Sequence, residues 1–162
     1  MSALVENETF ATMTVMGLFI LLFALERVFP LRLPSRRLLP RLTTNFFMAG
    51  LTLVIALLLV RPSALTAMSM SSEYSFGLLN LFEGSFEIKF LFGFLLLDLS
   101  FYYWHRLNHK WPFLWRFHNT HHIDPDLDTS TAFRFHFGEV ALSSIFRFAQ
   151  VIVIGPTLFI YL

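Results

Sequence analysis

The sequence contains no cysteine, and this absence narrows the chemistry open to the chain. Disulfide bonds, thiolate zinc sites and iron–sulfur clusters all need cysteine sulfur. Charged residues are scarce as well, at 14% of the chain against about 25% in soluble domains. The net charge of +1 gives no sign of the clustered basic face that nucleic acid requires. Any metal ion must therefore be held by nitrogen and oxygen ligands.

Hydrophobic residues are abundant, at 56% of 162 residues, and 21 residues are phenylalanine. This length is enough for one domain, but the chain lacks the polar surface to stay in water. A helix crosses the roughly 30 Å bilayer core with about 20 mostly apolar residues. Four stretches approach that length, at about 10–29, 44–60, 88–104 and 140–162. We predict an all-α integral membrane bundle of about four transmembrane helices.

The ends of these stretches carry specific expectations. The first has Glu6 and Glu8 before it, no preceding Lys or Arg and no small-residue cleavage pattern after it, so we expect a retained helix rather than a secretory signal. The second is expected to stop at Arg61-Pro62, because proline disrupts a helix interior. The fourth is expected to remain helical from Val140 to the last residue.

Positive charge indicates the orientation, because Lys and Arg are enriched in cytoplasmic loops. No Lys or Arg lies between Pro62 and Glu87, and the N-terminal tail is acidic. Two other segments are basic. Their basic residues are Arg32, Arg36, Arg37 and Arg41 in the first, and Arg106, Lys110, Arg116 and Arg134 in the second. We therefore expect the N-terminus outside and the segment 105–139 as a helical cap on the cytoplasmic face.

All six histidines lie in this expected cap, and their spacing points to a metal site. Each of them singly is more often satisfied by a local hydrogen bond, but the group is too dense for that explanation. Residues four apart share one face of a helix, with Cβ atoms about 5–6 Å apart. Imidazole suits iron, zinc, copper and nickel. The candidate ligands are His105, His109, His118, His121, His122 and His136.

Two carboxylates are candidates for a supporting role. Asp98 lies inside the third apolar stretch, seven residues before His105, and is expected either to accept a ligand N–H or to bond a neighbouring helix, for example at Asn45. Glu139 follows His136 by three residues and is expected to orient that histidine or to bind metal.

Other charged residues have two readings each. Arg116 and Arg134 could bind a carboxylate or phosphate headgroup, but they also fit the positive charge of a cytoplasmic loop, which we prefer. The run Asp124, Asp126 and Asp128 resembles a calcium loop superficially. It lacks the glycine and the closing glutamate of that motif, so a solvated turn is expected.

The motifs together resemble the fatty acid hydroxylase/sterol desaturase superfamily. The resemblance is carried by the segments 98–109, 115–122 and 131–136, which read DLSFYYWHRLNH, WRFHNTHH and TAFRFH. Glu26-Arg-Val-Phe-Pro30 and Arg41…Asn45 also look like that family. Phe137 departs from it, because proline often follows this histidine there. Members also carry a further H-x2-H-H box, so we expect the 162-residue chain to be a C-terminally incomplete domain, without turnover by itself.

The resemblance implies a di-iron oxygenase that hydroxylates or desaturates a lipid or sterol-like substrate. O2 would be the co-substrate, and the six histidines would match the family's metal-ligand boxes. Electrons would come from a partner protein, because no nucleotide-binding G-x-G-x-x-G motif is present. Two alternatives stay open. One is a membrane zinc hydrolase, and the other is a catalytically incomplete or decayed metal-binding membrane protein.

Overall fold

The computed structural model describes residues 2–161, with side chains described from Thr9 onward except at Ala11. Glu6 and Glu8, used in the orientation argument, therefore lie outside the described side chains. The described part is helical and contains no strand, which confirms the all-α prediction. Its α-helices are α1 (Ser2–Val28), α2 (Leu38–Ile55), α3 (Arg61–Glu73), α4 (Leu78–Leu81), α5 (Phe86–Lys110), α6 (Pro112–His122), α7 (Phe137–Ile154) and α8 (Leu158–Tyr161). A π turn, η1 (Ala56–Val60), and a 3-10 turn, η2 (Thr129–Phe133), complete the chain.

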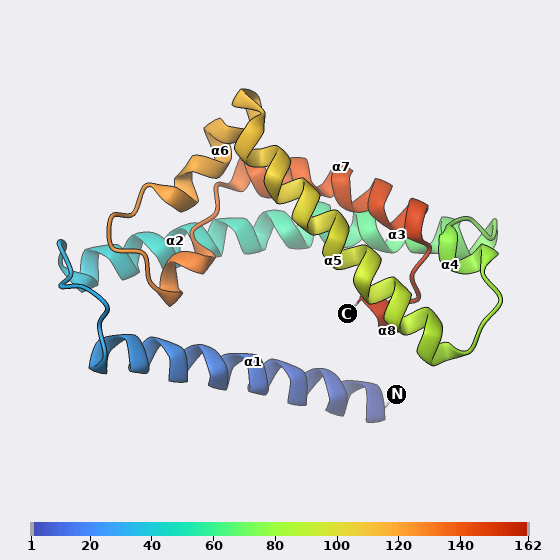
Figure 1. Cartoon of the computed structure of the whole chain (residues 1–162), viewed down its shortest axis with the longest axis horizontal. Coiled ribbons are helices and arrows are strands. Elements are labelled where there is room, and N and C mark those ends of the chain that lie inside the picture. Colours follow the sequence, from blue (N-terminus) through green and yellow to red (C-terminus); the bar gives the residue numbers. More distant parts are fainter. Residues whose placement is uncertain (1, 162) are drawn as a thin grey trace.

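The helix that begins with α2 does not stop at Arg61-Pro62, so that expectation is wrong. It continues through η1 into α3 as one long helical run (Figure 1). Proline cannot donate to the preceding turn, and its ring crowds the carbonyl four residues earlier. The π turn at Ala56–Val60 widens the helix where Pro62 disturbs it, which lets the chain continue. Among the described residues, two helical stretches are long and apolar enough to cross a membrane, Leu38–Leu81 and Phe137–Ile154.

The expectation that one helix runs from Val140 to the last residue is also wrong. α7 ends at Ile154 because Gly155 adopts a left-handed conformation with φ 67°, which glycine reaches without steric penalty. Pro156 follows, and α8 then turns back beside α5 (Figure 1). Gly155 also packs on Gly77, where a Cβ would lie 2.5 Å from the Gly155 Cα atom. Side chains at this crossing would push the two segments apart.

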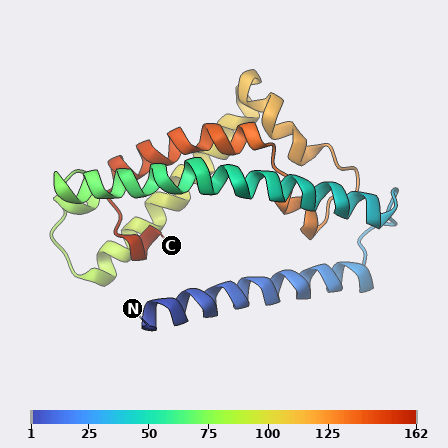
Figure 2. The ribbon, with the colours of Figure 1, turned by 180° about the vertical axis from the view of Figure 1, so that it is seen from behind.

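Two small apolar clusters hold the helices together. The first joins α3 to α7 through Ala64, Ala67 and Val151, whose small side chains let the helices approach closely. The second joins α4, α5, α7 and α8 through Leu79, Leu97, Ile154 and Ile160. α1 lies apart from these helices (Figures 1 and 2) and meets η2, where the rings of Phe19 and Phe133 are 4.9 Å apart.

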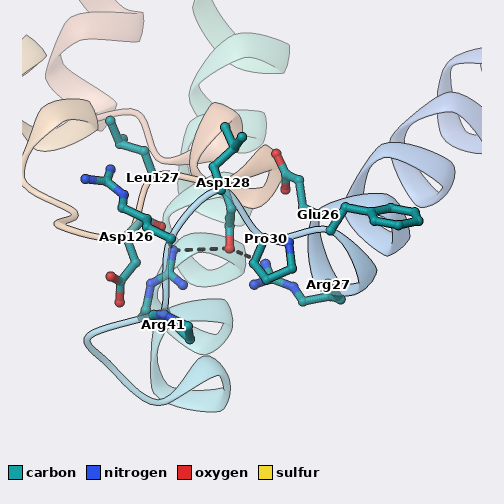
Figure 3. A pocket seen from close by; sticks show the side chains of 11 residues that line it. Glu26, Arg27, Pro30, Arg41, Asp126, Leu127 and Asp128 are labelled. Atoms are coloured by element: carbon teal, nitrogen blue, oxygen red, sulfur yellow. Dashed lines mark hydrogen bonds and ion pairs between the residues drawn. The ribbon is translucent and has the colours of Figure 1, made fainter.

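The aspartate run is not a solvated turn, which corrects the expectation from its sequence. Asp124 and Asp126 are 3% and 8% exposed. Arg41, in the first turn of α2, donates from Nε to both carboxylate oxygens of Asp124 at 3.1 Å and lies 3.2 Å from the Asp128 carboxylate. Arg27 also pairs with Asp128 (Figure 3). Arg41 from the first basic segment and Arg27 at the end of α1 thus pair with two of the three aspartates, Asp124 and Asp128.

Backbone groups extend this contact. Asp126 accepts hydrogen bonds from the backbone N–H groups of Ser35 and Arg36 at 2.8 and 2.7 Å. Glu26 accepts from the backbone N–H of Thr129 at 2.9 Å. We call the contact between residues 26–41 and 124–129 the arginine–aspartate clamp. It joins the two segments that sequence analysis assigned to one membrane face.

Candidate metal centre

Four of the six histidines converge on one point. His105 and His109 come from α5, and His118 and His122 come from α6. One ligand atom from each lies within 4.8 Å of the other three. The Nε2 atoms of His105 and His109 are 3.1 Å apart, and His118 Nε2 lies 3.3 Å from those of both His109 and His122. The group offers one ion up to four nitrogen ligands.

The turn between the two helices creates this convergence. Trp111 has an extended backbone, with φ −93° and ψ 115°, and both ends α5 and precedes α6. Pro112 favours that conformation in the residue before it and suits the first helical position. The spacing of four places each pair of histidines on one helix face, and the turn directs the two faces toward each other.

Glu139 holds the most buried histidine of the group. His118 is 0% exposed, and its Nδ1 lies 2.8 Å from Oε1 of Glu139. Its Nε2 remains directed at the other imidazoles. A metal-binding histidine usually donates its second ring N–H to a carboxylate or carbonyl, which fixes the ring and its tautomer. Glu139 orients His118, 21 positions away, rather than the expected His136.

Burial disfavours the charged form of His118 and His122 on α6. It lowers the pKa of His118 to about 4, with further lowering by nearby His109 and His121. Burial likewise lowers the pKa of His122, and the neighbouring histidines add to the effect. A neutral imidazole has a free lone pair for a metal ion. His118 and His122 therefore suit a metal that accepts nitrogen ligands, such as iron or zinc, because their lowered pKa values favour the neutral form near pH 7.

Trp115 is part of this centre, although sequence analysis did not select it. Its ring lies 5.3 Å from that of His109 and 5.6 Å from that of His122, centroid to centroid. It covers one side of the group with an apolar surface. Trp115 lies three residues before His118 on the same helix, so the sequence spacing could have predicted that both side chains share one helix face.

The other two histidines lie outside the group of four. His121 directs Nδ1 at the backbone oxygen of Thr131, 3.1 Å away, and stacks on Phe135. Its ring centroid is 5.1 Å from that of His122, so it borders the group. His136 instead accepts the backbone N–H of Gly138 at Nδ1 and thereby caps the start of α7.

The remaining candidates are dispersed. Asp98 is exposed on α5, and its carboxylate makes no hydrogen bond or ion pair with the described residues. Asn45, its suggested partner, donates to Ser130. Arg116 is exposed, whereas Arg134 lies 3.5 Å from the Asp124 carboxylate and belongs with the clamp.

Comparison with known proteins points to one family. Residues 90–162 match the model of the family described as fatty acid hydroxylase. An alkylglycerol monooxygenase from Xenopus tropicalis is 33% identical over 66 residues, and one from Homo sapiens is 33% identical over 67 residues. Each alignment covers 41% of this chain and 15% of the relative. No solved structure gives a significant match. The resemblance predicted from the histidine spacings is thus confirmed.

Proposed function

Since residues 90–162 match the fatty acid hydroxylase family, we propose that the protein is a membrane-bound iron oxygenase that oxidises a lipid with O2. The observation that carries this proposal is the convergence of His105, His109, His118 and His122 within 4.8 Å, next to long apolar helices. Imidazole ligands in such a place suit a metal that reacts with O2 beside an apolar substrate.

We assign these four histidines as ligands of a first iron ion. His121 and His136 remain proposed ligands of a second, in line with the di-iron sites that the family resemblance implies. Iron bound here would supply the activation of O2. Electrons would come from a separate donor protein.

The chain's own groups have defined tasks in this proposal. Glu139 accepts the Nδ1–H of His118 and so presents the Nε2 lone pair to the ion. The Thr131 carbonyl does the same for His121. Trp115 packs against His109 and His122 and gives one side of the group an apolar surface.

The substrate proposal draws on the relatives. Both are named as monooxygenases of alkylglycerols, which favours hydroxylation over desaturation and an ether lipid as the first compound to test. A sterol-like substrate remains the second choice. In either case the substrate is apolar and would reach the site from the membrane.

The proposed arrangement in the membrane has four crossings, by α1, the α2–α3 run, α5 and α7. The arginine–aspartate clamp supports it, because the two basic segments that it joins must lie on one face. The rule of positive residues inside makes that face cytoplasmic and puts the N-terminus outside. The histidine group follows α5 on the same face.

The decisive experiment measures metal and turnover together. The protein is purified from membranes, its iron and zinc are counted, and O2-dependent oxidation of a 1-O-alkylglycerol is assayed with a supplied reductant. Iron with O2-dependent product supports the proposal, and both must be lost in His109→Ala. Zinc without O2 consumption would point to a membrane hydrolase. Bound metal without any turnover would point to a catalytically incomplete or decayed metal-binding protein.

A further inference from the structure

A cavity lies away from the histidines, between the helical run 56–68, α7 and residues 158–161. Its volume is about 340 Å³, within the range of about 300–1,000 Å³ common for small-molecule sites. Most of its wall is apolar. The lining residues include Leu57, Val60, Leu65, Met68 and Leu158. Two arginines, Arg61 and Arg147, also line it.

Arg147 is held in place by aromatic rings. Its guanidinium carbon lies 4.0 Å from the centre of the Phe101 ring and 6.0 Å from that of Tyr161. Its Nη1 donates a long hydrogen bond of 3.4 Å to the Tyr161 hydroxyl. Its Nε is buried and has no hydrogen-bond partner in the described chain. The rings therefore hold the guanidinium in place, and its Nε–H remains free to donate a hydrogen bond to a ligand.

Neither arginine has a counter-ion among the described residues. The ion pairs of that part of the chain involve Arg27, Arg41, Arg134 and His118, and none involves Arg61 or Arg147. No Asp or Glu lines the cavity. A charged group inside an apolar helix is costly and is usually retained for function. Two cations without an acid make the cavity complementary to an anion.

The local backbone is consistent with a ligand site. Ala56, Leu57 and Val60 belong to the π turn η1, and all three line the cavity. Such turns widen a helix and occur often at functional sites. Although Pro62 explains why the turn forms here, the widened segment also contributes wall to the cavity.

We propose that this cavity binds a single-chain lipid with an anionic headgroup, a carboxylate or a phosphate. Arg147 and Arg61 contact the headgroup, and the hydrocarbon chain lies on the apolar wall. Arg147 follows Glu139 by eight residues in α7, which is about 12 Å along the helix axis. The site is thus separate from the histidine group, and its test is independent of the proposed oxygenase activity.

Photoreactive lipids test the proposal on the unmodified protein in a neutral detergent. Three probes carry the same diazirine-bearing C18 chain: a fatty acid, a lysophosphatidate and the corresponding alcohol. We expect the anionic probes to label wall residues such as Leu65 and Leu158, and the alcohol to label them weakly. The anionic probe that labels these residues more strongly shows whether the cavity prefers a carboxylate or a phosphate headgroup. Equal labelling by the alcohol, or labelling only outside the cavity, would overturn the proposal.

Variants then test the arginine directly. Arg147→Gln should reduce retention of the preferred anionic probe by about tenfold, the size expected for losing a hydrogen bond to a charged group. Arg147→Lys should retain an intermediate amount. Arg37→Gln removes an equal charge from the first basic segment and should leave retention unchanged. Unchanged retention of the probe in a folded Arg147→Gln protein would contradict the proposal. The metal content of this variant should stay at the wild-type level, because the cavity is separate from the histidine group.

Discussion

Glu139 and His118 are joined by a hydrogen bond of 2.8 Å between Oε1 and Nδ1, although they are 21 positions apart on different helices. This bond connects the start of α7 to the histidine group. A carboxylate in this position increases the basicity of the imidazole and fixes its orientation. The pair therefore links the packing of α7 to the ability of α5 and α6 to hold a metal.

Replacing Glu139 with Gln should weaken metal binding without abolishing it. An amide can still accept the Nδ1–H but carries no charge, and changes of this kind typically cost about 10–100-fold in metal affinity. Competition against a chelator of known affinity measures the change. Glu83→Gln, at an exposed position before α5, is the matched control and should not alter affinity. Equal affinity in both variants would show that Glu139 has no supporting role.

The histidines should divide into two classes. His109→Ala should lose bound metal while the protein still inserts into membranes, because His109 Nε2 lies within 3.3 Å of two other imidazole nitrogens. His136→Ala should cost about 1 kcal/mol by removing a helix cap, and His136→Asn should restore that stability. Metal content measured on all three separates ligation from capping. Less bound metal in a stable His136→Asn protein would support the proposed role of His136 as a ligand of a second iron, and unchanged metal content would limit His136 to capping.

The arginine–aspartate clamp should be a major source of stability. The side chains of Arg41 and Asp124 are 5% and 1% exposed. Removing Arg41 leaves the buried Asp124 carboxylate with only the longer ion pair to Arg134, at 3.5 Å. Arg41→Ala should therefore cost up to about 3–5 kcal/mol, the range for breaking a buried pair. Thermal unfolding in detergent measures this, with Arg37→Ala as an exposed control expected within about 0.5 kcal/mol of wild type. A small effect of Arg41→Ala would mean that the clamp is dispensable.

Acid should loosen the same region through Asp126. A hydrogen bond from the Ser35 backbone N–H is the main cause that lowers the pKa of this carboxyl below its usual 3.8. A group with a lowered folded pKa contributes stability above its unfolded pKa and loses it as pH falls through the folded value. Unfolding temperatures should therefore fall below about pH 4, and less steeply in Asp126→Asn. Glu73→Gln should keep the wild-type slope.

Membrane orientation can be tested with single cysteines, because the chain has none of its own. Leu127 and Leu81 are 53% and 77% exposed and lie at the clamp and at the end of α4. A membrane-impermeant maleimide added to intact cells should label Leu81→Cys but label Leu127→Cys only after lysis. Labelling of position 127 in intact cells would reverse the proposed orientation.

Local patterns in the sequence determined much of this protein. Apolar stretches predict helices, and a spacing of four in His105/His109 and His118/His122 predicts shared helix faces, because both depend only on helix periodicity. The missing cysteines restricted the ligands to nitrogen and oxygen, and the histidine spacings indicated the family that residues 90–162 match.

Only the tertiary structure decided which groups meet. Glu139 reaches His118, and the aspartates reach Arg27 and Arg41, because helices and turns distant in sequence pack together. Sequence spacing has no information on such contacts, so it paired Glu139 with its neighbour His136 and left the aspartates in solvent. The positions at which helices end could also be determined only from the structure. A π turn carries one helix past Pro62, and close packing on Gly77 accompanies the stop at Gly155.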